Sequence, residues 1–235
     1  MNIKAFLKRI NIDAFESAFK WRFIDKYFSG FERSKLKNKD FSIIGNNCVA
    51  GGMYHKFGLK YTTPTIWTFF FPEEYIRFLE NLDWYLKQPL EFTKETKHPM
   101  AYRLSEIIHR NYPIGVLGGD VEIHFMHYKT EEEALEKWTR RIKRVNFNNL
   151  FIIFSDAEEE FKEELLERYE KLTYEHKIFF SSKPRSICKS TVFVEDYAEA
   201  THVYDSTRNR KYEKYIDLVK WLNCEKDFLK TKMKS

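Results

Sequence analysis

Cys48 is the residue whose type and surroundings most favour chemistry in this sequence. The apolar run Phe41 to Ile44 predicts a buried strand, and a Gly-Asn-Asn turn joins this strand to the cysteine. The next residues, Val49 to Phe57, predict a helix that ends at Gly58. Cys48 would then lie at a helix N-terminus, where the helix dipole and free N–H groups favour the nucleophilic thiolate. The alternative is a small buried cysteine that only packs in a strand-to-helix turn.

The residues around the cysteine are candidates for binding a substrate. Asn46 and Asn47 form the turn, because asparagine tolerates left-handed backbone. Gly51 and Gly52 follow inside the expected helix, where each glycine costs roughly 1 kcal/mol. This cost indicates that a ligand or another backbone approaches the chain closely at that point.

Two histidines further along the chain are candidate bases for the cysteine. The run Val121 to Tyr128 alternates as a strand does, which places His124 and His127 on opposite faces. A histidine on an apolar strand face is more often a hydrogen-bonded core residue, but an unpaired cysteine elsewhere in the chain favours catalysis. Asp156 follows the expected strand Leu150 to Phe154, and open α/β sheets carry functional side chains at strand ends.

A basic helix is expected after the histidines. Thr130 and Glu133 predict a capping box at its start. Its expected buried stripe consists of Leu135, Trp138, Ile142 and Val145. Its cations fall on another face and are Lys137, Arg140, Arg141 and Arg144. This ridge suits a pyrophosphate or an anionic lipid head group. The alternative is a solvated face whose cations pair with Glu133 and Glu136.

The remaining segments predict alternating strands and helices. Further expected strands are Ile66 to Phe71, Lys177 to Phe180 and the edge strand Val192 to Val194, and a loop with Pro113, Gly115, Gly118 and Gly119 precedes the histidines. Further expected helices are residues 2–32, a helix that begins at Pro72, Ala157 to Tyr169, and Lys211 to Leu222, with a connector from Ser29 to Asp40. The alternation predicts one α/β domain over residues 1–235, a three-layer α/β/α fold with a mixed or mostly parallel sheet. Residues 1–40 would form a helical N-terminal extension and connector.

Composition limits the class of protein. The 235 residues carry a formal net charge of +5 with both signs interspersed, so the charge does not indicate a nucleic-acid partner. No apolar run is long enough to cross a membrane, and the N-terminus lacks the apolar core of a signal peptide. Three widely separated cysteines fit a reducing compartment and no zinc spacing. We therefore expect a cytoplasmic protein without a metal or another cofactor. Its basic N-terminal helix also suits peripheral contact with an anionic membrane.

Four stretches of the sequence resemble one bacterial family. They are FSIIGNNCVAGG, LKYTTPTIWTFFFPEEYIRFLENLDWYL, PIGVLGGDVEIHFMHYKTEEEALEKWTRRIKR and the closing YEKYIDLVKWLN. Because these stretches are spread along the chain, the resemblance extends over nearly all of it after about residue 35. This is the domain of unknown function family nineteen-nineteen, whose members are often labelled exopolysaccharide biosynthesis proteins. The resemblance implies a cytoplasmic α/β protein encoded with surface-polysaccharide enzymes. It implies no proven reaction.

The family is also distantly similar to a set of papain-like cysteine peptidases. In these, a cysteine near the start precedes a strand-borne histidine, and an arginine-rich helix follows. The matching positions are Cys48, His127 or His124, and the arginines of Trp138 to Arg144, with Asp156 as the acidic residue that orients the histidine. Val49 departs from the pattern, because members commonly carry a tryptophan after the cysteine. An aromatic substrate wall would therefore be absent.

Two classes of function fit these residues, one that uses the cysteine site and one that does not. A cysteine-dependent acyltransferase or hydrolase would act on a glycan precursor, with Cys48, His127 and Asp156 as nucleophile, base and orienting carboxylate. A non-catalytic assembly or binding protein of the polysaccharide machinery would instead use the aromatic surface and the basic N-terminal helix.

A third function is glycosyl transfer from a sugar nucleotide. Asp120 or Glu122 would bind a metal or act as base, although one acidic residue is a weak metal signal. The pyrophosphate of the donor would be held by Arg140, Arg141 and Arg144.

Overall fold

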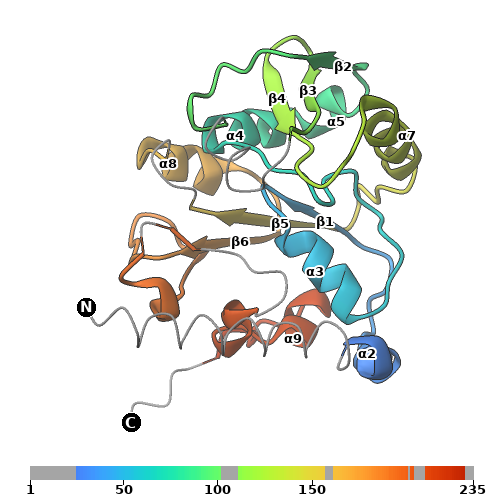
Figure 1. Ribbon diagram of the computed structural model, residues 1–235. Helices are drawn as coiled ribbons and strands as arrows, with labels where there is room; N and C mark the ends of the chain where they lie inside the picture. Colours follow the sequence, from blue (N-terminus) through green and yellow to red (C-terminus); the bar gives the residue numbers. More distant parts are fainter. Residues whose placement is uncertain (1–24, 102–110, 157–160, 201, 204–209, 231–235) are drawn as a thin grey trace, which may run out of the picture.

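The described part of the chain contains a parallel and an antiparallel β-sheet (Figure 1). The computed structural model describes residues 25–101, 111–156, 161–200, 202–203 and 210–230. The parallel sheet has the order β1 (Ser42–Gly45), β5 (Leu150–Ser155), β6 (His176–Ser181) and β7 (Thr191–Phe193). The antiparallel sheet consists of β2 (Leu90–Thr93), β3 (Ile114–Leu117) and β4 (Val121–His124). The expected α/β fold with a mostly parallel main sheet is confirmed.

Helices and the antiparallel sheet cover the two faces of the parallel sheet and give three layers (Figure 1). On one side lie the antiparallel sheet, α4 (Pro72–Glu80), α5 (Leu82–Tyr85), α7 (Glu131–Ile142) and α8 (Glu164–Lys171). On the other side lie α3 (Val49–Lys56), α9 (Leu218–Leu222) and the 3-10 turns η2 (Glu195–Tyr197) and η3 (Lys211–Lys214). The helix α2 (Asp25–Ser34) packs against α3.

The central strand β5 builds a core on each face of the parallel sheet. Ile152 and Phe154 pack toward α4 and α8, whereas Phe151 and Ile153 pack toward α3 and α9. A run of apolar residues without polar alternation is what a parallel strand covered on both faces requires. Gly45 of β1 lies opposite Ile153 in the register. The chain segments that leave β1 and β5 therefore emerge side by side at the carboxyl edge of the sheet.

The segment 66–71, which was expected to be a strand, forms only a single bridge. Phe69 pairs with His124 through two backbone hydrogen bonds of 2.8 and 2.9 Å. No strand forms because Trp67 has a left-handed backbone, with φ of 63°, and Pro72 begins α4 directly afterwards. The segment still joins the two sheets, since the Phe70 N–H donates to the backbone carbonyl at the end of β1 (2.8 Å).

The glycine-rich stretch before the histidines is a hairpin and not the expected loop. Gly118 and Gly119 turn the chain from β3 into β4 with φ of 60° and 81°, which glycine adopts without strain. The expected strand to Tyr128 is too long, because β4 ends at His124 and a turn follows at residues 126–127. His127 therefore lies in a turn, and the alternation of the strand does not determine where it points.

Three other boundaries differ from the expected ones. The closing helix, expected over Lys211 to Leu222, is divided because Asp217 has an extended backbone and its side chain caps α9. The helix α8 begins inside the expected span Ala157 to Tyr169, whose first residues lie outside the described part. The helix α2 reaches Ser34, so the connector expected from Ser29 is shorter.

Most of the expected N-terminal helix lies outside the described residues. Only α2 falls within the expected span, residues 2–32, so contact of its basic part with an anionic membrane stays a prediction. No helix in the described ranges is long and apolar enough to cross a membrane. A single domain over residues 1–235 also stays a prediction.

Candidate functional site

Cys48 lies between β1 and α3, in the strand, turn and helix arrangement that the sequence predicts. It is the N-cap residue of α3 and is half-buried. Figure 1 shows β1 leading directly into this helix. The first turn of α3 contains no acidic residue, and the N–H of Val49 is bound by the Asn47 side chain (3.0 Å). The positive end of the helix dipole therefore faces the sulfur without a carboxylate from its own helix.

Two asparagines fasten the Cys48 turn to the neighbouring strand end. Asn46 is fully buried, and its side chain both donates to the Ser155 carbonyl and accepts from the Ser155 N–H, each at 3.1 Å. The amide of Asn47 donates to the Ser155 hydroxyl (2.6 Å). These residues, proposed as substrate-binding, hold the turn in place. The site thus has a rigid floor made from the ends of β1 and β5.

Asp156 fastens the next two strand ends in the same way. It is buried, and one carboxylate oxygen accepts hydrogen bonds from the Ser181 hydroxyl (3.0 Å) and from the N–H and hydroxyl of Ser182 (2.7 and 3.0 Å). The other oxygen accepts from the Val203 N–H (2.7 Å). In the described part of the chain, none of its hydrogen bonds comes from a histidine. Its hydrogen bonds hold the ends of β5 and β6 together.

Tyr128 and Arg141 form a pair beside Cys48. The Tyr128 hydroxyl donates to the Ile66 carbonyl (2.6 Å) and accepts from Nη1 of Arg141 (2.5 Å). Burial raises the pKa of Tyr128 to about 12, the Arg141 charge lowers it, and electrostatic interaction with Cys48 raises it. Tyr128 therefore stays protonated at neutral pH. It lies within electrostatic reach of both the sulfur and a guanidinium.

Trp67 links the helix of Cys48 to His127. A methyl group added at Gly51 would lie 3.3 Å from the Trp67 indole, so the glycine makes room for this side chain. The ring of Trp67 contacts the His127 ring edge to face at 5.6 Å. His127 itself is exposed. The close approach expected at the glycine pair is thus made by an aromatic side chain. Gly52 is buried, and its N–H donates to the Cys48 carbonyl (3.2 Å).

The basic helix α7 is capped as the sequence predicts, but its buried stripe differs. The Thr130 hydroxyl accepts from the Glu133 N–H (3.2 Å), as in a capping box. Trp138 is buried, whereas Leu135 is 42% exposed, which contradicts the expected stripe. Ala134 and Arg141 occupy the buried positions instead. The apolar face is narrow, so one arginine is carried into the interior.

His124 lies in a separate polar group that we call the Glu74 cluster, which also contains Lys97, His98 and Glu122. One Glu74 oxygen is 2.9 Å from the Lys97 ammonium and 3.4 Å from the His98 ring, and the other accepts from the Glu122 N–H (3.0 Å). His124 is fully buried, and neither ring nitrogen has a hydrogen-bond partner among the described residues. Burial lowers its pKa to about 3, and the charge of His98 lowers it too. His124 is therefore neutral at physiological pH.

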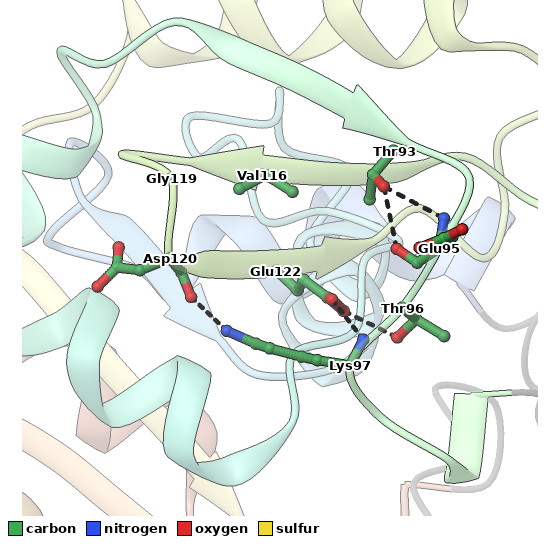
Figure 2. Close-up of a pocket in the computed structure, with 8 residues that line it drawn as sticks. All are labelled: Thr93, Glu95, Thr96, Lys97, Val116, Gly119, Asp120 and Glu122. Carbon is green, nitrogen blue, oxygen red and sulfur yellow. Dashed lines mark hydrogen bonds between the residues drawn. The ribbon is translucent and has the colours of Figure 1, made fainter.

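Asp120 and Glu122 border a groove of about 330 Å³ on the antiparallel sheet, which Figure 2 shows. The Glu122 carboxylate accepts from the Thr96 hydroxyl (2.8 Å) and the Lys97 N–H (2.9 Å). The Asp120 carboxylate is turned away from Glu122 (Figure 2) and accepts from the Tyr85 hydroxyl (3.0 Å). Within the described ranges, no hydrogen bond or ion pair joins this groove to Arg140, Arg141 or Arg144. The two halves expected of a glycosyltransferase site are not brought together by these contacts.

Several residues of the Cys48 edge were not found from the sequence. Tyr61, Trp67 and Tyr128 contact it or its neighbours, yet each belongs to a different segment of the chain. Their one sequence signal was that Tyr128 directly follows His127. Ser155, which binds Asn47, lies with Asp156 at the strand end where the sequence predicts functional side chains. Within the described residues, no group of three or more His, Cys, Asp or Glu side chains is arranged to hold a metal ion.

The fold and this edge define an α/β protein with a cysteine at the start of a helix, beside the carboxyl edge of a parallel sheet. The chain belongs to the family described as Domain of unknown function (DUF1919), whose model matches residues 20–223. It is similar to an uncharacterized protein of Haemophilus influenzae, with 32% identity over 194 residues that cover 80% of this chain and 87% of that relative. The family resemblance is confirmed. The distant similarity to papain-like cysteine peptidases stays a prediction.

Proposed function

We propose that this protein is a cysteine-dependent enzyme that transfers or hydrolyses an acyl group on a glycan precursor, with Cys48 as the nucleophile. The observation that carries the proposal is the position of Cys48 as N-cap of α3, within electrostatic reach of Tyr128, whose hydroxyl binds Arg141. A partly exposed cysteine at a helix N-terminus is in a setting that favours the thiolate. The glycan precursor of exopolysaccharide or capsule is proposed from the label that members of the resembled family often carry.

His127 is the histidine we assign as base. It is exposed and lies across Trp67 from the helix of Cys48. A base must also return its proton to the leaving group, so it must be able to carry one near neutral pH. His124 does not meet this condition, because burial lowers its pKa to about 3. Asp156 positions the strand ends in this assignment.

The reaction proceeds in two halves. His127 takes the thiol proton, and the Cys48 sulfur attacks the carbonyl carbon of an ester. The C–S bond forms, the C–O bond to the donor breaks, and the leaving alkoxide takes the proton from His127. In the second half, His127 takes a proton from an acceptor hydroxyl or from water, whose oxygen attacks the thioester and releases the thiolate. The N–H groups that follow Val49 in the first turn of α3 suit the oxyanion of both steps, because the Val49 N–H is already bound to Asn47.

The test is to trap the thioester. The full chain is incubated with p-nitrophenyl acetate, quenched in acid and mapped by peptide mass spectrometry. We expect one acetyl group on the Cys48 peptide, none in Cys48→Ala, and unchanged labelling of Cys48 in Cys224→Ala, which removes an exposed thiol. Acetylation confined to other cysteines, or equal acetylation of all three, would refute the proposal. A non-catalytic assembly or binding protein would then be the better explanation.

A further inference from the structure

We propose that Arg141 of α7 and Arg144, which lies just beyond the C-cap of that helix, form an anion subsite at the Cys48 edge, and that this subsite takes a phosphoryl group of the substrate. The inference deepens the proposed function by naming a substrate class. It rests on that function only in placing the reaction at Cys48, because anion binding can be measured without any reaction.

The four cations of this basic ridge, three in α7 and Arg144 just beyond it, fall into two pairs with opposite surroundings. Lys137 is 2.5 Å from a Glu133 oxygen, and Arg140 is 3.0 Å from a Glu136 oxygen, each one helical turn away. These two cations are neutralised on the helix surface, as the solvated-face alternative expects. Arg141 and Arg144 have no carboxylate partner among the residues that the structure describes. Their positive charge is therefore available to a bound anion.

Arg141 makes the stronger case, because it is 5% exposed. It contacts the Tyr128 hydroxyl (2.5 Å) and the face of the Tyr61 ring (5.2 Å to the ring centre), which are both uncharged. A buried cation is costly to keep without a counter-charge. A guanidinium has five N–H donors in a planar fork, and one hydrogen bond leaves most of them available. The arrangement is therefore a preformed receptor for an anion.

Arg144 and α3 extend the receptor. Arg144 lies three residues beyond Arg141 and donates to the Tyr61 carbonyl (3.2 Å), so both arginines are held by the same tyrosine. Cys48 is the N-cap of α3 and lies within electrostatic reach of Tyr128, the residue that binds Arg141. Forked arginines and free helix N–H groups are the donors that proteins use for phosphoryl oxygens. Two arginines and a helix end offer more donors than one carboxylate can use, so a phosphoryl group is the better match.

The test measures binding of pyrophosphate, inorganic phosphate and malonate to the full chain at constant ionic strength, by isothermal titration calorimetry. We expect pyrophosphate to bind in the wild type, phosphate more weakly, and malonate at least tenfold more weakly than pyrophosphate. Arg144→Gln should weaken pyrophosphate at least tenfold, and Arg141→Gln should abolish binding. Arg140→Gln is the matched control, because it removes a charge from the same helix outside the subsite, and should change affinity less than twofold.

Three outcomes would count against the subsite. Equal losses in Arg140→Gln and Arg144→Gln would show general attraction to a basic helix. If malonate binds as tightly as pyrophosphate, the subsite does not select a phosphoryl group and a carboxylate is an equally good ligand. No pyrophosphate binding in the wild type would leave Arg141 as a counter-charge for the Cys48 thiolate alone. If Arg141→Gln does not fold, which circular dichroism shows, Arg144→Gln decides. Pyrophosphate binding with an unreactive Cys48 would refute the proposed function and leave the subsite standing.

Discussion

Two polar regions lie on opposite sides of the segment 66–71, which bonds to Asn46 on one side and to His124 on the other. The Cys48 edge contains a half-buried thiol and, in the described part, a buried guanidinium without a carboxylate partner. The Glu74 cluster contains more ionisable groups, but Lys97 and His98 lie against Glu74, and Glu122 accepts hydrogen bonds from its neighbours. The guanidinium at the Cys48 edge therefore lacks a counter-charge, whereas most charges in the Glu74 cluster have an opposite charge or a hydrogen-bond partner beside them.

This difference separates a receptor from a structural support. A buried polar group whose charges are satisfied internally holds its surroundings in one arrangement. A site that has to bind a ligand keeps donors and charge unsatisfied at a surface that the ligand can reach. On this reasoning, mutations in the Glu74 cluster should act on stability, and mutations at the Cys48 edge should act on reactivity and binding.

The largest effect should come from removing the central carboxylate of the cluster. Glu74→Ala leaves Lys97, His98 and the Glu122 N–H without their shared partner, so we expect a loss of about 3–5 kcal/mol in the free energy of unfolding. Urea denaturation followed by circular dichroism measures this loss. Glu73→Ala, on the same helix, removes a surface pair with Arg168 and should cost less than about 1 kcal/mol. Similar losses of unfolding free energy in the two variants would show that the Glu74 cluster is not a special structural support.

The next effect is a dependence of stability on pH that His124 creates. Burial lowers the pKa of His124 to about 3, below the unfolded value of about 6.5. Between these values the unfolded chain binds the extra proton, so the stability present above about pH 6.5 is lost as the pH falls toward 3. The slope should reach about 1.4 kcal/mol per pH unit. His124→Phe should flatten this part of the curve, and an unchanged slope in the variant would place the titrating group elsewhere.

A smaller effect is expected at the Cys48 turn. Asn47→Ala removes the bond to the Ser155 hydroxyl and the cap on the Val49 N–H, so we expect about 1–2 kcal/mol of lost stability. The same change should slow alkylation of Cys48, because the sulfur loses its fixed position at the helix end. Asn148→Ala, an exposed asparagine, should stay within about 0.5 kcal/mol. Faster alkylation in Asn47→Ala would show that the turn shields the thiol.

Local features of this fold could be predicted because the residues that cause them are consecutive. The run Phe41 to Ile44, the turn and the glycine stop place Cys48 correctly, and the capping box of Thr130 needs only four residues. Alternation was misleading for His127, because side-chain types went on alternating after β4 had ended. The divided closing helix depends on whether Asp217 caps or continues a helix, and residue type does not decide this.

The long-range contacts of the site could not be predicted. Arg141 looks like any cation of a basic helix, and only the folded chain shows that it is buried against Tyr128. Leu135 is exposed for the same reason, since the angle at which α7 packs determines which residues face the core. Periodicity gives the shape of a helix but not its orientation. The functional interpretation of the arginine ridge therefore required the structure.

The central claim is that Cys48 is a reactive thiol, and its rate of alkylation by iodoacetamide tests this most directly. Labelling of each cysteine in the native chain is followed by mass spectrometry from pH 6 to 9. Burial raises the pKa of Cys188 to about 11 and also raises that of Cys224, so both provide slow internal references. We predict that Cys48 labels fastest near neutral pH, that His127→Asn slows it, and that His124→Gln does not. Labelling of Cys48 only after denaturation, or no faster than Cys224, would contradict the account.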